Sequence, residues 1–309
     1  MNELRFDGKV AMVTGAGRNL GREYALLLAA RGARIVVNDI GVGISDTDGL
    51  AEAPAQNPAH AVVDEIRAAG GEAVANTDTV ATAEGGAAIV QSTLDAFGAV
   101  DIVVNNAGQV RMAPFATFPD ELIDPVIDTQ LRGVLNVSRP AWKFMAEHHG
   151  GRFVNVASGA AFGGVPGGAV YGMTKMGVIG LTRAMASEGR PDGIAANVIV
   201  PSAKTRPGTG FGPIPWSDEL ADWLHPRLVA PLVGWLAHGD CPLSGECLTV
   251  GGGHFARVGL VTNDGILDRD ATIETLAERV DDLTGGPTTP MESAGGAMAA
   301  MFRDYPGPR

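Results

Sequence analysis

Residues 10–21 read VAMVTGAGRNLG, in which a short apolar run passes directly into a glycine-rich turn. The run predicts a buried strand over residues 10–13, and the residues after Gly21 have helical character. Glycines allow a tight strand-to-helix turn, while the helix N-terminus presents N–H donors and a partial positive charge. A strand, a glycine turn and a helix in this order are typical of a site for the pyrophosphate of a nucleotide. A plain connecting turn is the alternative interpretation.

Short apolar segments alternate with helical segments along most of the chain. The expected strands cover residues 10–14, 34–38, 72–76, 102–105, 152–156, 194–200 and 247–250. The expected helices cover residues 22–31, 59–69, 84–97, 122–147 and 169–188. This alternation predicts an α/β fold, in which one doubly wound parallel sheet of seven strands carries helices on both faces.

Two segments depart from this compact plan. Residues 40–58 form a long connection rich in Gly, Asp and Pro, where α/β units normally use about two to six residues. We interpret it as an insertion beside the end of the second strand. Residues 1–259 are expected to form one catalytic domain. Residues 260–309 are expected to form a partly flexible C-terminal extension with one acidic helix over residues 270–283.

Composition and charge argue against several classes of protein. The chain of 309 residues has 35 Asp and Glu against 23 Lys and Arg, and its net charge of -12 opposes binding to nucleic acid. No apolar run approaches the roughly 18 residues of a membrane-spanning helix. Charges occupy the N-terminal stretch, where a signal peptide needs apolar residues. We therefore expect a cytoplasmic protein without a membrane span.

The two cysteines are expected to be reduced thiols, because no secretory signal is recognised. Cys241 and Cys247 are flanked by His238 and His254. The spacing of these four residues matches no pattern of metal ligands. We therefore predict no metal site.

The second expected strand leads into Asp39, which follows the glycine turn by about 20 residues. A carboxylate at this place can accept hydrogen bonds from the adenosine ribose hydroxyls, and it would repel a 2′-phosphate. No Arg or Lys occupies the adjacent positions, Asn38 and Ile40. The pattern therefore favours NAD over NADP as the cofactor. Asp39 as a simple cap of the following loop is the alternative.

A third signal combines Ser158, at the end of a predicted strand, with Tyr171 and Lys175 on a predicted helix. The spacing of four residues places Tyr171 and Lys175 on one helical face. A nearby ammonium group favours the phenolate and lowers the pKa of a tyrosine from its ordinary value of about 10. The three residues suit general acid/base chemistry. Taken singly, the Tyr and Lys pair occurs often by chance, and Ser158 could be only an N-cap.

Together these motifs resemble the short-chain dehydrogenase/reductase family over about residues 6–255. The segments that carry the resemblance are TGAGRNLG at 14–21, Asp78 in NTDTV, NNAG at 105–108, Ser158, and YGMTK at 171–175. The resemblance implies a single Rossmann-type domain that binds NAD. It also implies that Tyr171 is the general acid/base, that Ser158 binds the substrate oxygen, and that Lys175 holds the nicotinamide ribose.

The resemblance further implies a set of residues around the cofactor. They are Gly15, Arg18, Asn19, Leu20 and Gly21 at the glycine turn, Asp39, Asp78 and Thr79 toward the adenosine, Asn106, Ala107 and Gly108 beside the central strands, and Tyr171, Lys175, Pro201 and Thr205 toward the nicotinamide. Family members associate through two long helices, here residues 121–147 and 169–188. A homodimer or a homotetramer is therefore expected.

Within the family, the segments VVNDIG, EIRAAGGEAVANTDTV and QLRGVLNVSRPAW resemble the (3R)-hydroxyacyl-CoA dehydrogenase unit of peroxisomal multifunctional enzymes of type 2 and of their bacterial relatives. Residues 205–223 occupy the place of a mobile substrate loop in this family, and their apolar content suits a fatty acyl or steroidal group. Most members have Asn where this chain has Gln130, and Gly where it has Ser202. This subfamily also varies at both places, so Gln130 is expected to serve a proton relay of altered geometry.

These patterns lead to one functional expectation and several alternatives. We expect an NAD-dependent enzyme that interconverts a secondary alcohol and a ketone, with a small apolar substrate of the 3-hydroxyacyl-CoA type. A hydroxysteroid or other alcohol dehydrogenase acting on a free substrate is the second hypothesis. A dinucleotide-sensing protein without turnover is the third, and the change at Gln130 also leaves an inactive enzyme open.

Overall fold

The computed structural model describes residues 3–42, 56–148, 150–205 and 217–291. Most of the predicted insertion (residues 43–55), most of the predicted substrate loop (206–216) and the end of the predicted extension (292–309) lie outside these residues. The chain divides into two compact units, Met1–Arg257 and Val258–Arg309. No helix within the described ranges is long and apolar enough to cross a membrane.

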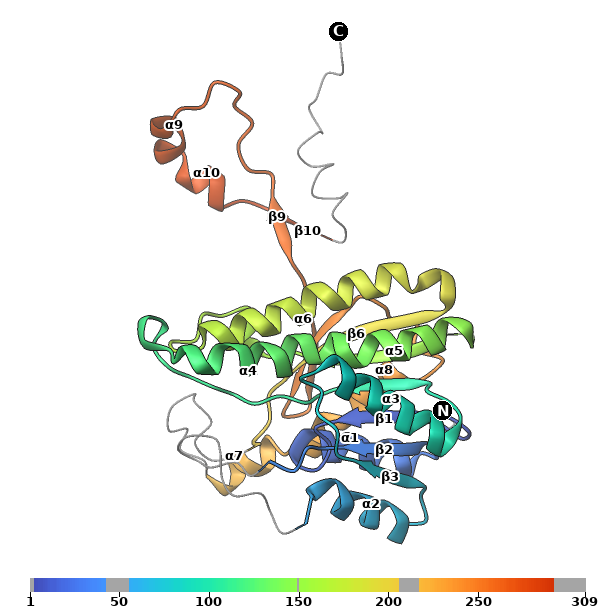
Figure 1. Cartoon of the computed structure of the whole chain (residues 1–309). Helices are drawn as coiled ribbons and strands as arrows, with labels where there is room; N and C mark the ends of the chain where they lie inside the picture. Colours follow the sequence, from blue (N-terminus) through green and yellow to red (C-terminus); the bar gives the residue numbers. More distant parts are fainter. Residues whose placement is uncertain (1–2, 43–55, 149, 206–216, 292–309) are drawn as a thin grey trace. The chain divides into compact units, whose positions relative to one another are not determined.

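The first unit is built on one large sheet (Figure 1). Its strands are β1 (Val10–Thr14), β2 (Arg34–Asn38), β3 (Ala73–Asn76), β4 (Ile102–Asn105), β5 (Gly151–Val156), β6 (Ile194–Pro201), β7 (Cys247–Gly251) and β8 (His254–Val258). They lie in the order β3-β2-β1-β4-β5-β6-β7-β8. Each neighbouring pair from β3 to β7 is parallel. The predicted doubly wound parallel sheet is therefore confirmed.

The sheet has eight strands instead of the seven expected. The extra strand, β8, follows β7 after only Gly252 and Gly253, whose φ values of 57° and 76° lie in the left-handed region that glycine adopts readily. A connection of two residues allows the chain to turn back beside the strand it has just left. The side chains of β8 are exposed or half-buried, so this strand lacks the apolar run by which the other strands are predicted.

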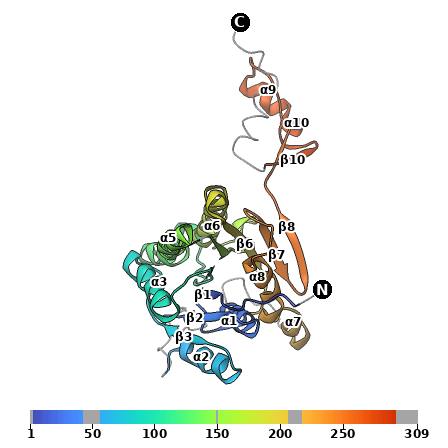
Figure 2. The same ribbon diagram turned by 90° about the vertical axis from the view of Figure 1, so that its right-hand side faces the viewer.

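Helices cover both faces of the sheet (Figure 2). They are α1 (Asn19–Ala30), α2 (Pro58–Ala68), α3 (Ala83–Phe97), α4 (Ile123–Ile127), α5 (Gly133–Glu147), α6 (Ala169–Glu188), α7 (Asp218–Trp223) and α8 (Ala230–Ala237). Successive residues of β1 point to opposite faces: Ala11 and Val13 join the core under α1, α2 and α8, whereas Met12 joins the core under α3, α5 and α6. This alternation is the normal consequence of the strand's period of two.

The predicted single helix over residues 122–147 is divided in the structure. A π-helical segment, Asp128–Arg132, separates α4 from α5. π-Helical turns inside longer helices are frequent at functional sites. The buried residue of this segment is Gln130.

The second unit contains a two-stranded antiparallel ladder and two short helices. The strands β9 (Val261–Asn263) and β10 (Thr288–Pro290) pair with each other. The predicted acidic helix over residues 270–283 is observed as α9 (Ile273–Glu278) and α10 (Val280–Thr284). Arg279 separates them, with φ -110° and ψ 27°.

Candidate active site

The carboxyl ends of β1 and β4 meet at the centre of the sheet. The connection after β1 leads to one face and the connection after β4 to the other, which is where ligands bind in open α/β sheets. The Thr14 hydroxyl accepts hydrogen bonds from the backbone N–H groups of Asn106 and Ala107, both at 3.1 Å. The Asn106 amide donates to the carbonyls of Thr14 and Gly15, both at 3.0 Å. The structure thus brings the predicted glycine turn and the predicted NNAG residues together.

Gly15 allows this close contact between the two segments. Its φ is 60°, and a Cβ atom placed on it would lie 2.8 Å from the Cα atom of Ala107. A larger residue would therefore push the turn away from the end of β4. The glycine is required by the packing of the protein itself, whether or not a ligand is bound.

The start of α1 suits an anionic ligand. Arg18 is its N-cap residue, and among the described residues no side chain caps the first turn, which also contains no acidic residue. Instead, Arg18 donates to the carbonyl of Val42 at 3.2 Å. Asn19 has a φ of 48°, and Leu20 and Gly21 continue the first turn. Uncapped N–H groups at a helix N-terminus favour a phosphate group.

Asp39 lies beside this turn, at the end of β2. One carboxylate oxygen accepts from the N–H of Gly17 at 3.1 Å, and the other accepts from the N–H of Gly41 at 2.9 Å. Asp39 therefore does cap the loop that follows it. Each carboxylate oxygen has a second lone pair, so the cap leaves acceptor capacity for ribose hydroxyls.

Asp78 and Thr79 follow β3, the strand at the edge of the sheet. The Asn76 amide donates to the Asp78 carboxylate at 2.8 Å, and the Asn38 amide donates to the Asp78 carbonyl at 2.9 Å. The hydroxyl of Thr79 accepts from the N–H of Ala81 at 3.1 Å. These bonds tie the predicted adenine-side residues to the carboxyl ends of β2 and β3.

The predicted acid/base residues also meet. Ser158 follows β5, and its side chain is near enough to that of Tyr171 on α6 to lower the pKa of the tyrosine. The Ser158 hydroxyl also accepts from the N–H of Ala160 at 3.3 Å as the N-cap of a short 3-10 helix, Gly159–Ala161. Lys175, one turn along α6, donates to the carbonyl of Val156 at 3.0 Å. The N-cap interpretation of Ser158 is therefore observed, and Ser158 also acts on the neighbouring Tyr171.

The electrostatics of this group differ from the sequence-based expectation. Burial raises the pKa of Tyr171 above its ordinary value, and the hydrogen bond with Ser158 opposes this rise. Burial also lowers the pKa of Lys175 to about 8. The expectation considered only the spacing of the two residues, whereas removal from water disfavours both charged forms. The predicted lowering of the tyrosine pKa by Lys175 is therefore not seen in the protein alone.

Comparisons with known proteins show the family of this chain. A sequence model of the short chain dehydrogenase family matches residues 9–207. The chain belongs to the short chain dehydrogenase family. The family consists of oxidoreductases that use a nicotinamide dinucleotide, NAD or NADP.

Three relatives show how far the likeness of this chain to known proteins extends. Peroxisomal multifunctional enzyme type 2 of Mus musculus is 38% identical, over 97% of this chain and 40% of that enzyme. A short chain dehydrogenase from Mycobacterium avium has a TM-score of 0.78 at 36% identity, over 93% of this chain and 99% of that one. The full-length multifunctional enzyme type 2 from Drosophila melanogaster has a TM-score of 0.79 at 31% identity, over 97% of this chain and 50% of that one. The chain spans half or less of both multifunctional enzymes.

Gln130 is buried close to the central strands. Its side-chain nitrogen donates to the carbonyl of Gln109 at 2.7 Å, while its side-chain oxygen has no hydrogen-bond partner among the described residues. A Cβ atom on Gly108 would lie 3.0 Å from that oxygen. The buried oxygen is an acceptor that a water molecule or a ligand could satisfy.

Pro201 and Thr205 lie at the carboxyl end of β6, on the same edge of the sheet as Ser158. Pro201 is the last residue of β6 and pairs with Val250 of β7. Thr205 is the last described residue before residues 206–216 and is half-buried. The predicted nicotinamide-side residues therefore belong to this edge.

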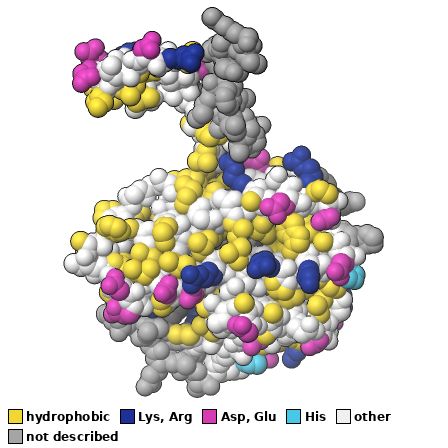
Figure 3. Space-filling model, turned by 45° about the horizontal axis from the view of Figure 1, so that its top comes forward, with side chains coloured by type: hydrophobic (Ala, Val, Ile, Leu, Met, Phe, Trp, Pro, Cys, Tyr) yellow, Lys and Arg dark blue, Asp and Glu magenta, His cyan; other side chains and the backbone are white. Residues whose placement is uncertain are grey.

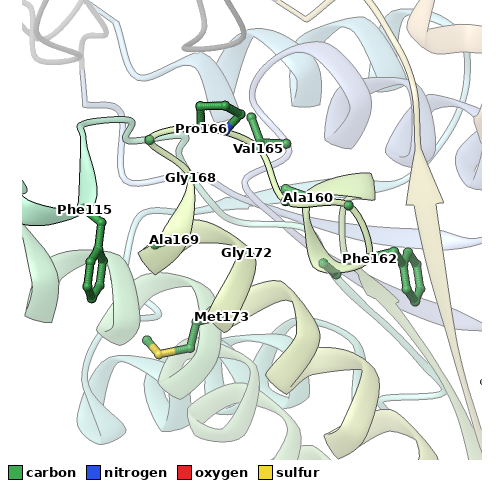
Figure 4. Close-up of a pocket in the computed structure, with 13 residues that line it drawn as sticks. Phe115, Ala160, Phe162, Val165, Pro166, Gly168, Ala169, Gly172 and Met173 are labelled. Carbon is green, nitrogen blue, oxygen red and sulfur yellow. The ribbon is translucent and has the colours of Figure 1, made fainter. Parts of the chain in front are cut away.

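An apolar groove of about 560 Å³ lies beside the acid/base residues (Figure 4). Its lining includes Ala160, two residues after Ser158, and Gly172, directly after Tyr171. Its larger side chains belong to Phe115, Phe162, Val165, Pro166 and Met173. Sequence reasoning did not select these residues. The stretch GGVPGG at 163–168, between Ser158 and Tyr171, was the available signal, because so many glycines leave room beside a backbone.

Proposed function

We propose that the protein is an NAD-dependent dehydrogenase that interconverts a secondary alcohol and a ketone, with 3-hydroxyacyl-CoA esters as its substrate class. The observation that carries the proposal is the group of Ser158, Tyr171 and Lys175 at the carboxyl edge of the sheet, in which the Lys175 ammonium lies 5.7 Å from the centre of the Tyr171 ring and Ser158 lowers the pKa of Tyr171. Membership of the short chain dehydrogenase family supports it.

In alcohol oxidation the substrate oxygen sits between Ser158 and Tyr171. The hydroxyl of Ser158 donates a hydrogen bond that orients this oxygen, and the Tyr171 phenolate takes its proton. A bound NAD would supply the hydride acceptor at C4 of its nicotinamide ring, which carries a positive charge when oxidised. Lys175, anchored on the Val156 carbonyl, adds a second positive charge that favours the phenolate. In the reverse direction Tyr171 returns the proton to the ketone oxygen.

Gln130 belongs to the same proposal as a relay residue. Its side-chain oxygen, which has no partner in the part of the chain that the structure describes, is buried beside Gly108, where a water molecule would find an acceptor. Such a water would link the buried interior to the acid/base group. This role is expected to assist proton exchange and not the hydride step itself.

The preference for NAD over NADP rests on Asp39. A fixed carboxylate at the end of β2 accepts hydrogen bonds from ribose hydroxyls and repels a 2′-phosphate. The uncapped start of α1 would receive the pyrophosphate, with Gly15, Arg18, Asn19, Leu20 and Gly21 around it. Asp78, Thr79, Asn106, Ala107 and Gly108 would line the adenosine side, and Pro201 and Thr205 the nicotinamide side.

The substrate class follows from the groove and from the relatives. An apolar lining suits an acyl chain, and the relatives include multifunctional enzymes of the type that the sequence resembles. A free hydroxysteroid is the second candidate, because the same lining would accept a steroid skeleton. A sensor without turnover would not need the complete group of Ser158, Tyr171 and Lys175.

Association into a homodimer or a homotetramer is also proposed. The face of the first unit that carries α5 and α6 shows apolar side chains at its surface (Figure 3). Leu135 of α5 and Met176 of α6 are each 36% exposed. Burial of such a helical face against a second copy is a common solution in symmetric oligomers. Sedimentation of the purified chain tests it: a monomer at micromolar concentration would contradict the proposal.

The proposed reaction is tested by following the absorbance of NADH with three kinds of alcohol: 3-hydroxyacyl-CoA esters, hydroxysteroids and simple secondary alcohols. We expect NAD reduction with the CoA esters, and a much weaker reaction with NADP. Reduction with steroids alone would support the second candidate. Tight NAD binding without turnover on any of the three would support a sensor and overturn the proposed reaction.

A further inference from the structure

We propose that Asn57 is a positioning residue for the adenosine end of the cofactor site, acting through Asp39. The inference rests on the proposed binding of NAD at the glycine turn. Asn57 directly precedes α2. It lies near the end of the predicted insertion, residues 40–58, and Asp39 directly precedes the start of that insertion. The half-buried side chain of Asn57 joins the two described ends of this connection.

The Asn57 side chain makes two hydrogen bonds, one within α2 and one to the end of β2. Its oxygen accepts from the N–H of Ala59 at 2.9 Å and so caps α2. Its nitrogen donates to the backbone carbonyl of Asp39 at 2.8 Å. The first bond is local to the helix, whereas the second crosses from α2 to the end of β2. The second bond is the one that concerns the cofactor site.

The backbone around this contact is tightly packed. Gly41 has a φ of 74°, and a Cβ atom on it would lie 2.5 Å from the nitrogen of the Asn57 side chain. A Cβ atom on Gly17 would lie 2.8 Å both from the Asp39 carboxylate and from the ring of Pro58. The glycine turn, the end of β2 and the start of α2 are therefore in direct contact. A displacement of the backbone in one of these segments would displace the other two.

Asp39 is held at both its backbone and its side chain. Asn57 holds the carbonyl, while the N–H groups of Gly17 and Gly41 hold one carboxylate oxygen each. With the main chain held by Asn57, the carboxylate keeps one orientation, and its remaining lone pairs are ready for the ribose hydroxyls. A ligand that meets a fixed partner loses less free energy to ordering it. Loss of the Asn57 bond should therefore weaken binding of the adenosine half and leave hydride transfer unaffected.

The chain offers variants that separate the two bonds. Asn57→Ser keeps an oxygen that can cap α2 but removes the donor to Asp39, because serine is also a good N-cap residue. Asn57→Ala removes both bonds. Glu65→Gln is the matched control, since it weakens the ion pair of α2 with Arg22 of α1, which is 2.6 Å long, and leaves Asn57 and Asp39 in place.

The test measures the dissociation constants of NAD and ADP-ribose by calorimetry, together with kcat, the KM of the alcohol and the melting temperature of each full-length variant. One lost hydrogen bond predicts a rise of about five- to tenfold in both dissociation constants for Asn57→Ser and for Asn57→Ala. We expect kcat at saturating NAD and the KM of the alcohol to stay within about twofold. Only Asn57→Ala should lower the melting temperature clearly, and Glu65→Gln should leave both dissociation constants unchanged.

Two results would overturn the role of Asn57. One is a wild-type affinity for ADP-ribose in Asn57→Ser. The other is a loss of affinity that follows the melting temperature across all three variants, because this would be the mark of a purely structural residue. A wild-type protein that binds neither NAD nor ADP-ribose would instead remove the proposed function itself, and with it this inference.

Discussion

The ammonium nitrogen of Lys175 lies 5.7 Å from the centre of the Tyr171 ring. Both side chains are buried, at 5% and 8% exposure. Burial lowers the pKa of Lys175 to about 8 and raises that of Tyr171. In the protein alone, each group is therefore pushed toward its neutral form. This pair has measurable consequences for stability and for the dependence of the rate on pH.

Replacing Lys175 by Met should remove a pH-dependent loss of stability. The folded chain holds Lys175 with a pKa of about 8, against 10.5 for the free side chain. Between these values the unfolded chain binds more protons, so the stability of the wild type rises with pH in this window. The loss of stability that Lys175 causes in the wild type is fully present below about pH 8. It disappears above pH 10.5, the pKa of the side chain in the unfolded protein.

The difference in stability between Lys175→Met and the wild type should therefore change by about 3 kcal/mol between pH 7 and pH 10.5, in favour of the variant at pH 7. Urea unfolding of both proteins at a series of pH values measures it. Parallel stability curves for the two proteins would show that Lys175 is not buried as described.

Ser158→Ala should shift the pH profile of alcohol oxidation. The hydrogen bond from Ser158 lowers the pKa of Tyr171 and so opposes the effect of burial. Without it the phenolate forms only at higher pH. We expect the alkaline rise of kcat/KM to move to higher pH, in addition to a lower maximum. An unchanged profile would contradict the pairing of the two hydroxyl groups.

Tyr24→Phe should stabilise the protein. Tyr24 on α1 is fully buried, and its hydroxyl has no partner among the described residues. Removal of a buried, unpaired hydroxyl is expected to raise the free energy of unfolding by about 1 kcal/mol. Tyr24→Ala, which opens a cavity, should instead lower it by about 3–5 kcal/mol. A destabilised Tyr24→Phe protein would reveal a partner for the hydroxyl.

Gly164→Leu tests whether the groove holds the acyl chain. Gly164 lines the groove, and a Cβ atom on it would meet nothing within 4 Å, so a larger side chain fits there without strain. We expect kcat/KM to fall about tenfold or more for long-chain 3-hydroxyacyl-CoA esters and little for short ones. Gly239→Leu is the control, because Gly239 is equally open and lies in the connection between α8 and β7. Equal effects on all chain lengths would assign the groove another role.

Much of the fold and the site could be predicted from the sequence. The alternation of apolar strands and helices predicted the seven parallel strands, because buried strands carry continuous apolar runs. In the structure the motif residues Thr14, Gly15 and Asn106 contact one another, and Ser158 lies near Tyr171. These contacts follow from the rule that the carboxyl ends of parallel strands share one edge of the sheet.

The features that were missed have physical reasons. Strand β8 is exposed and has no apolar run, and the π-helical segment around Gln130 changes hydrogen bonding without changing the spacing of apolar residues. The pKa of Tyr171 depends on burial, which the spacing to Lys175 does not reveal. The contact of Asn57 with Asp39 joins two ends of a long connection, and no local pattern encodes it.

The central claim is that the Tyr171 hydroxyl transfers the proton during the redox step. Its most direct test is single-turnover formation of NADH from a 3-hydroxyacyl-CoA ester by the wild type and by Tyr171→Phe, with NAD affinity measured in parallel. The account predicts nearly unchanged NAD affinity and a rate reduced by about 10²- to 10⁴-fold in the variant. A rate close to that of the wild type would contradict it.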